Sequence, residues 1–148
     1  MAKSTNLKYF IPSLIWMIVI FVFSSQNASE STQSSSYILD FLQQLPILNS
    51  LHADTFMLII RKSAHIIEYG ILCLTLIYGF FKVNKNYYYT YPILISCLYA
   101  MTDEFHQLFV DGRSGSIIDV CIDTFGAILV ALFILIINKF KKSTTSKN

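Results

Sequence analysis

The stretch "YFIPSLIWMIVIFVFSSQNAS", Tyr9 to Ser29, holds no charged residue along its whole length. As a helix rising about 1.5 Å per residue, it would cross the hydrocarbon core of a bilayer, which is roughly 30 Å thick. The rest of the 148-residue chain is similarly apolar: 54% of its residues are hydrophobic, 14% are charged, and the mean hydropathy is +0.54. A soluble domain of this size would need far more polar surface to cover its core. The chain is therefore expected to be an integral membrane protein.

Further apolar blocks predict an all-α, polytopic membrane protein that forms one domain over residues 1–148. Four transmembrane helices are expected, at about residues 9–25, 56–81, 87–109 and 117–138, followed by a basic cytoplasmic tail at 139–148. The first loop is rich in Ser, Gln and Asn and then becomes apolar from Tyr37 to Leu45. This second part predicts a short amphipathic helix on the membrane surface, stopped by Pro46.

The placement of lysines predicts the direction of the chain. Lys3 and Lys8 precede the first span, Lys82 and Lys85 fill the second loop, and four lysines follow the fourth span. By the positive-inside rule, both termini are expected in the cytoplasm and the long first loop outside the cell membrane. One alternative is that the first apolar run is a cleaved signal peptide, although "FSSQNASES" has no good small-x-small cleavage site.

Ionisable side chains are expected to gather in the outer half of the membrane. The uncharged part of the second span, Tyr69 to Phe81, covers only about 20 Å at 1.5 Å per residue, so the turns before it must also lie in the membrane. Unpaired charges are costly there and should face one another or a water-filled pocket. Helical spacing gives three polar stripes, which are Arg61, His65 and Glu68; Asp103, His106 and Gln107; and Asp119, Asp123 and Gly126. Together they predict a polar cleft open to the outside.

The loop "VDGRSGS", Val110 to Ser116, joins the third and fourth spans. Its Asp-Gly and Ser-Gly pairs are typical of tight turns, and Arg113 stands between them. Arg113 is expected either to form a surface pair with Asp111 or to place its guanidinium over the cleft, where it could hold a carboxylate or phosphate. The three cysteines lie in apolar segments without CxxC spacing and are expected to be small core residues.

The chain resembles the VanZ-like family of small membrane proteins. The resemblance is carried by "FSSQ" (Phe23 to Gln26), "RKSAHIIEYGILCL" (Arg61 to Leu74) and "DEFHQLFVDGRSGSIIDVCIDTFG" (Asp103 to Gly126). It covers nearly the whole chain, and it implies that the family pattern falls on Arg61, Lys62, His65, Glu68, Tyr69, Asp103, Glu104, His106, Gln107, Gly112, Arg113, Asp119 and Asp123. In one departure, Asp111 stands where the family turn usually has proline before Gly-Arg. The founding member is associated with low-level resistance to the glycopeptide teicoplanin.

Two alternative functions are expected for this cleft. It could bind an anionic envelope lipid or a cell-wall precursor and alter access for glycopeptide antibiotics. Alternatively, the protein could be a membrane enzyme in which His106 or His65 acts as the base, Asp103 or Glu104 orients it, and arginines hold an anionic substrate. The candidate residues for either role are Arg61, Lys62, His65, Glu68, Asp103, Glu104, His106, Gln107, Arg113, Asp119 and Asp123.

Three other interpretations concern the same groups. His65, Glu68, Asp103, His106, Asp119 and Asp123 include suitable ligands for zinc or a harder divalent ion, although no HExxH motif is present and the sequence leaves cofactors open. Transport is disfavoured because the inner halves of the spans hold no group that changes charge near neutral pH. The charges could also form only a structural network. The expected partners are the lipid bilayer and an anionic envelope component, and not nucleic acid.

Overall fold

The computed structural model describes residues 6–42, 53–83 and 87–145 of the chain. Over these residues the only regular elements are helices, as expected for an all-α protein. The elements are η1 (Asn6–Phe10), α1 (Ile11–Ser24), α2 (Ala28–Leu42), α3 (Ala53–Val83), α4 (Thr90–Gln107) and α5 (Ile117–Thr145). The four long helices expected from the apolar blocks correspond to α1, α3, α4 and α5, with ends displaced by a few residues.

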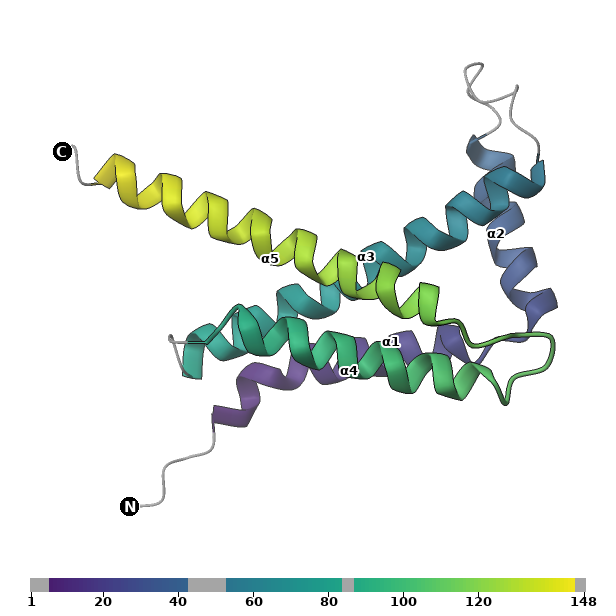
Figure 1. Cartoon of the computed structure of the whole chain (residues 1–148), viewed down its shortest axis with the longest axis horizontal. Helices are drawn as coiled ribbons and strands as arrows, with labels where there is room; N and C mark the ends of the chain where they lie inside the picture. Colours follow the sequence, from purple (N-terminus) through teal and green to yellow (C-terminus); the bar gives the residue numbers. More distant parts are fainter. Residues whose placement is uncertain (1–5, 43–52, 84–86, 146–148) are drawn as a thin grey trace.

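These four helices alternate in direction, so that η1 and the far end of α5 lie at the same end of the molecule (Figure 1). The helices α3 and α5 cross near their middles and make the most extensive contact in the fold. Helix α4 packs against both, α1 packs against α3 and α4, and α2 packs against α3. The crossing of α3, α4 and α5 is where the polar stripes of three separate helices can meet.

Three helical stretches are long and apolar enough to cross a membrane, namely Leu7–Ser24, Asp54–Val83 and Ile117–Lys142. Large apolar side chains on them, such as Ile18 and Phe133, are exposed, as side chains that face lipid would be. Helix α4 is not among the three, because its last turns carry two carboxylates, a histidine and a glutamine. The fourth span therefore stays a prediction.

Hydrogen bonds from aromatic side chains tie α1 to its neighbours. The Trp16 indole Nε1–H donates to the backbone oxygen of Glu68 on α3 at 2.8 Å. The Tyr99 hydroxyl of α4 donates to the backbone oxygen of Met17 at 2.7 Å. Both bonds flank a buried cluster that includes Tyr69. In an apolar setting a buried donor without a partner is costly, so these two bonds fix the position of α1 against α3 and α4.

Glycine allows the close approach of α3 and α5. A Cβ added at Gly126 would stand 2.4 Å from the backbone oxygen of Ile66 and 2.9 Å from its Cα. The stripe Asp119, Asp123 and Gly126 predicted this approach, since small residues let transmembrane helices come together. The contact is one residue from His65 along α3 and three residues from Asp123 along α5, so it also sets the distance between those two side chains.

Helix α2 corrects the expected loop after α1. The sequence was expected to stay irregular until Tyr37, but the helix begins at Ala28. Asn27 and Glu30 form a capping box: the Asn27 Oδ1 accepts from the Glu30 backbone N–H at 2.9 Å, and a Glu30 carboxylate oxygen accepts from the Asn27 N–H at 3.0 Å. This local cap starts the helix nine residues earlier than the apolar pattern indicates. Leu45 and Pro46, the expected end of the surface helix, lie outside the described residues, and its place on a membrane surface is untested.

The C-terminal helix also differs from the expectation. A basic tail was expected from residue 139, but α5 continues through Lys139 and Lys142 to Thr145. No glycine or proline interrupts this segment, and lysine is a good helix former. Cations in a last turn are further favoured by the negative end of the helix dipole. The lysines therefore extend the membrane helix.

Candidate functional site

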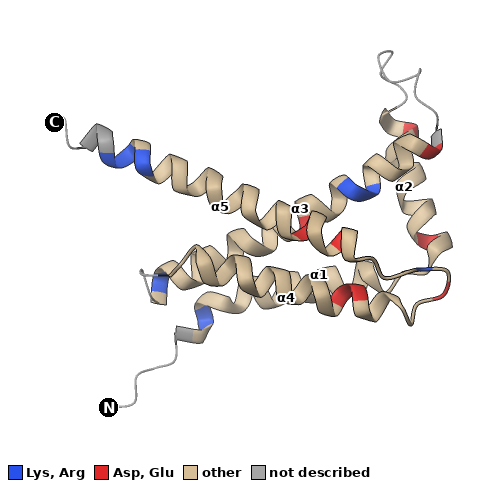
Figure 2. Cartoon of the chain, viewed as in Figure 1, with Lys and Arg blue, Asp and Glu red and all other residues tan. Residues whose placement is uncertain are grey.

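The acidic side chains gather toward one end of the helix bundle. Figure 2 shows Asp and Glu on α4 and on the first turns of α5, whereas the basic residues of η1, the end of α3 and the end of α5 lie at the opposite end. A separate basic pair stands near the start of α3, close to the acidic region. The candidate residues of the three helices thus lie toward the same end of the bundle.

A cavity of about 230 Å³ opens at this level. Six of the candidate residues line it, namely Arg61, His65, Glu68, Asp103, Gln107 and Arg113. The other candidates, Lys62, Glu104, His106, Asp119 and Asp123, are not part of its lining. The cavity therefore divides the predicted set into residues that a ligand could touch and residues that support them.

Helix α2 forms a wall of this cavity, which the sequence interpretation missed. Ser31, Ser34, Ser35 and Ile38 all line it. They stand at i, i+3, i+4 and i+7, which is one face of a helix, so the signal was present in the sequence. It was overlooked because the segment is polar and serine-rich, a composition typical of loops.

Arg113 is held at the cavity by the loop between α4 and α5. The Arg113 N–H donates to the Val110 oxygen at 3.1 Å, and Gly112 has a φ of +72°, which closes a turn that glycine accepts without strain. The Asp111 backbone oxygen accepts from the Ala28 N–H at 3.2 Å, which docks the loop on the start of α2. The turn thus aims Arg113 across the α2 wall.

The guanidinium of Arg113 has no carboxylate partner among the described residues. Its Nη1 donates to the Ser31 hydroxyl at 2.8 Å, and its buried Nε has no hydrogen-bond partner. The alternative of a pair with Asp111 is not found: the ion pairs among the described residues are Lys62 with Asp119 and His65 with Asp123. Burial lowers the pKa of Arg113 below its ordinary value and nearby Arg61 lowers it further, while the carboxylates of Glu104, Asp103 and Glu68 partly offset this. Arginine nevertheless remains charged at neutral pH.

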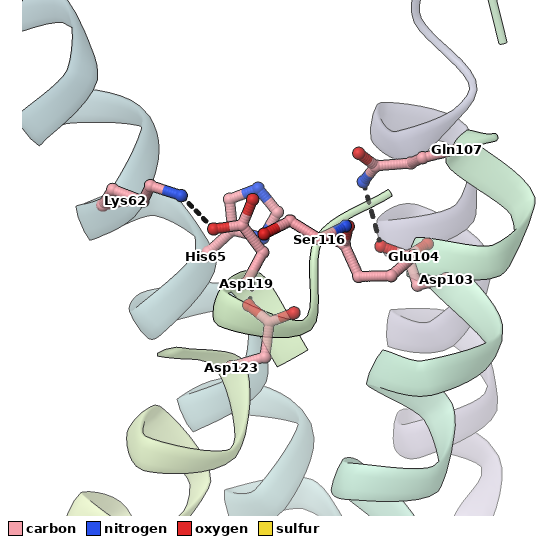
Figure 3. Close-up of polar contacts among 8 residues, drawn as sticks. All are labelled: Lys62, His65, Asp103, Glu104, Gln107, Ser116, Asp119 and Asp123. Carbon is pink, nitrogen blue, oxygen red and sulfur yellow. Dashed lines mark hydrogen bonds and ion pairs between the residues drawn. The ribbon is translucent and has the colours of Figure 1, made fainter. Parts of the chain in front are cut away.

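Two ion pairs join α3 to α5. The Lys62 Nζ contacts Asp119 Oδ1, and the His65 Nδ1 lies 3.0 Å from Asp123 Oδ1 (Figure 3). Asp123 is fully buried. A carboxylate can only accept, so the shared proton of the second pair belongs to the His65 Nδ1. The remaining ring nitrogen of His65, Nε2, is then free of that proton in the neutral imidazole.

Glu104 holds the start of α5. Its Oε2 accepts from the Ser116 backbone N–H at 2.7 Å, directly before the first residue of the helix. A carboxylate there satisfies a free N–H and complements the helix dipole. Gly115 makes the approach feasible, since a Cβ at that position would stand 2.3 Å from the Glu104 backbone oxygen. The second carboxylate oxygen, Oε1, is buried and has no partner.

The three residues of the polar stripe on α4 lie in two different environments. Asp103 and Gln107 are buried, line the cavity, and share a hydrogen bond from Gln107 Nε2 to Asp103 Oδ2 at 3.4 Å. His106 instead stacks on Phe21 of α1 at 4.7 Å between ring centroids.

His106 is a weaker candidate for the base than the sequence indicates. Its Nε2 lies 3.2 Å from the Ser25 hydroxyl, which donates its single proton to the Phe21 oxygen at 2.7 Å. The Nε2 must then be the donor in the contact with Ser25. Of the two histidines, His65 is the one that has both a carboxylate partner and a place in the cavity wall.

The arrangement supplies two kinds of chemistry. Two guanidinium groups can hold an anionic group at one side of the cavity, while Glu68 and Asp103 offer acceptors for hydroxyl or amine donors. The histidine oriented by Asp123 has the geometry of a general base. Both uses involve residues that line the cavity, together with Asp123 behind His65, and not the whole set of ionisable residues.

Comparison with known proteins gives one match. A family model described as VanZ/LLP1 matches residues 9–138, which is most of the chain. The comparisons with curated proteins and with solved structures found no match. The matched range includes every residue of the cavity wall.

Proposed function

The chain belongs to the VanZ/LLP1 family of membrane proteins, and on that premise we propose that it binds an anionic envelope component in the cavity beside Arg113. The ligand carries a phosphate or carboxylate and is either an anionic membrane lipid or a lipid-linked cell-wall precursor. In this proposal the protein is a multi-pass protein of the cell membrane with four spans, both termini are cytoplasmic, and the cavity opens outward.

One observation carries this proposal: the half-buried Arg113 lines the cavity, pairs with no described carboxylate and keeps an unsatisfied buried Nε. A half-buried guanidinium with no directly bonded carboxylate lacks strong hydrogen-bond partners, and a bound anion would supply them as charge-assisted hydrogen bonds. Arg61 lines the same cavity and adds a second positive charge.

The size of the cavity limits what it can hold. Its volume of about 230 Å³ is below the roughly 300–1,000 Å³ of pockets that enclose drug-sized ligands. A single polar headgroup is therefore favoured over an antibiotic molecule. The carboxylates of Glu68 and Asp103 would repel a second anionic group but would accept hydrogen bonds from hydroxyl or amine groups on the same ligand.

Direct binding tests the proposal. The purified chain is mixed either with phosphatidylglycerol or with a lipid-linked cell-wall precursor, and native mass spectrometry measures the bound fraction. We expect Arg113→Ala to weaken binding of the true ligand at least about tenfold, because one charge-assisted contact contributes roughly 1.5–3 kcal/mol. Lys82→Ala is the matched control, since Lys82 lies over the Tyr78 ring at the other end of α3. The proposal would be contradicted if Arg113→Ala bound each of the two ligands as tightly as the intact protein does.

A link to antibiotics follows from the family and is tested in cells. In a teicoplanin-sensitive Gram-positive host, expression of the intact protein is expected to raise the inhibitory concentration of teicoplanin. Arg113→Ala at equal membrane levels is expected to lose that protection, whereas Lys82→Ala keeps it. Protection by Arg113→Ala as strong as that of the intact protein would separate the phenotype from the cavity.

The second candidate function is an enzyme acting on the same ligand. The hydrogen bond between His65 and Asp123 favours it, because a carboxylate that fixes one ring nitrogen prepares the other to accept a proton. The same mass spectra decide between the two functions. A bound ligand of unchanged mass indicates binding alone, and a product whose formation His65→Gln abolishes indicates catalysis.

A further inference from the structure

One side chain from each of three helices meets where α3, α4 and α5 come together. His65, Glu104 and Asp123 each place one nitrogen or carboxylate oxygen so that the three atoms lie within 4.8 Å of one another. Figure 3 shows them converging from the three separate ribbons. A set of one imidazole and two carboxylates is a common ligand set for divalent transition metals.

Two buried oxygen atoms of this cluster have no donor. Asp123 is 0% exposed and its Oδ2 has no hydrogen-bond partner, and Glu104 is 4% exposed and its Oε1 has none. A buried acceptor left unsatisfied costs about 1–3 kcal/mol, and more when it is charged. The unused lone pairs of two carboxylates therefore call for a cation or for added protons.

The described cations do not satisfy both carboxylates. Lys62 pairs with Asp119, and His65 contacts only one oxygen of Asp123. No described lysine, arginine or histidine forms an ion pair with Glu104. The negative charge of Glu104 and half of the acceptor capacity of Asp123 remain for another positive group.

We propose that His65, Glu104 and Asp123 bind a divalent metal ion of the zinc type. With bonds of about 2.0–2.2 Å, two ligands of a tetrahedral ion lie roughly 3.3 Å apart. When the ion binds, His65 releases its Nδ1 proton to solvent, and the 3.0 Å between Nδ1 and Asp123 Oδ1 is then close to the ligand separation. Glu104 needs to move by no more than about 1.5 Å. The imidazole ligand favours zinc over calcium or magnesium, which prefer oxygen atoms only.

The surroundings of Glu104 fit a metal ligand. The Ser116 N–H holds Oε2 at 2.7 Å, which orients the carboxylate and leaves Oε1 free for the ion. Such outer contacts fix metal ligands in known sites. Three protein ligands leave a fourth position open for water, and His65 lines the cavity, so this position would be next to the ligand site.

This proposal is independent of the anion-binding proposal, because neither Arg113 nor Arg61 is a metal ligand. The two can fail separately. Arg113→Ala is expected to bind zinc as tightly as the intact protein does, whatever its effect on lipid binding.

The test uses the purified full chain, stripped with EDTA and titrated with Zn²⁺ and Co²⁺. We expect one ion to bind per chain. Bound Co²⁺ should give a visible absorption spectrum typical of an ion with a low coordination number. Asp123→Asn, Glu104→Gln and His65→Asn are each expected to weaken Zn²⁺ binding by at least about tenfold. The matched controls are His106→Asn and Asp119→Asn, which change the same residue types outside the cluster and should bind as the intact protein does.

Two results would overturn the metal site. One is that the folded intact protein binds no stoichiometric Zn²⁺. The other is that all three ligand variants bind Zn²⁺ with the affinity of the intact protein. If a variant does not fold, Cu²⁺ bound to the intact protein decides the question. Its electron paramagnetic resonance spectrum should show coupling to one imidazole nitrogen, and a spectrum without nitrogen coupling rules out His65 as a ligand.

Discussion

Gly126→Ala is expected to be less stable than Gly70→Ala by at least about 2 kcal/mol, because the new methyl group would strike backbone and not a side chain. At Gly126 the Cβ would lie 2.4 Å from the Ile66 oxygen, and α3 cannot withdraw without leaving α5. At Gly70 the nearest atom is a Val130 methyl at 3.1 Å, which can turn aside. Both changes gain the same helix propensity of about 1 kcal/mol.

The comparison is measured by unfolding the two purified variants in mixed detergent micelles with increasing SDS. Because both variants exchange glycine for alanine inside a long helix, the propensity gain cancels and the steric cost remains. In the folded fraction of Gly126→Ala, α5 is moved away from α3. His65 and Asp123 are then separated, so any activity that needs their contact should be lost. Equal unfolding midpoints would mean that α3 and α5 can accommodate a methyl group at their crossing without loss of stability.

The second large effect concerns the buried pair of His65 and Asp123. Asp123→Ala is expected to be less stable than Asp123→Asn by about 1–3 kcal/mol when EDTA is present. Both variants lack the negative charge, but asparagine keeps an oxygen that accepts from the His65 Nδ1–H. Alanine leaves this donor unpaired on a side chain that is only 15% exposed and also leaves a void.

The matched control for this comparison is the same pair of changes at Asp119. Its partner Lys62 has a side chain 32% exposed, so water can replace the lost contact. The difference between Asp119→Ala and Asp119→Asn should therefore stay below about 1 kcal/mol. If the difference at Asp123 is no larger than the difference at Asp119, the His65 contact does not stabilise the fold.

Local sequence patterns predicted the long helices well and α2 poorly, for a physical reason. An apolar run of bilayer length has few alternatives to a helix in lipid, so α1, α3 and α5 follow from composition alone. Helix α2 depends on a capping box at Asn27 and Glu30, which hydropathy does not register. Its serine face became meaningful only because α2 packs on α3.

The candidate site shows the same division. Spacing predicted that Asp103, His106 and Gln107 share a face of one helix. It could not predict that His106 stacks on Phe21 while the other two line the cavity, because that depends on where α1 lies. Asp103 or Glu104 was expected to orient a histidine, and spacing gave no sign that Glu104 also caps α5 through a contact across the connecting loop.

By itself, the sequence determined that this chain is an all-helical membrane protein of the VanZ/LLP1 family, and it predicted which candidate residues of its helices would lie near one another. Those properties depend on composition, on motifs and on the length of apolar runs, which are local quantities. Only the tertiary structure decided that Lys62 pairs with Asp119, His65 with Asp123, and Arg113 with no carboxylate among the described residues. Helical spacing gives each side chain a face but no partner, and here the partner was decided by the close crossing of α3 and α5 at Gly126.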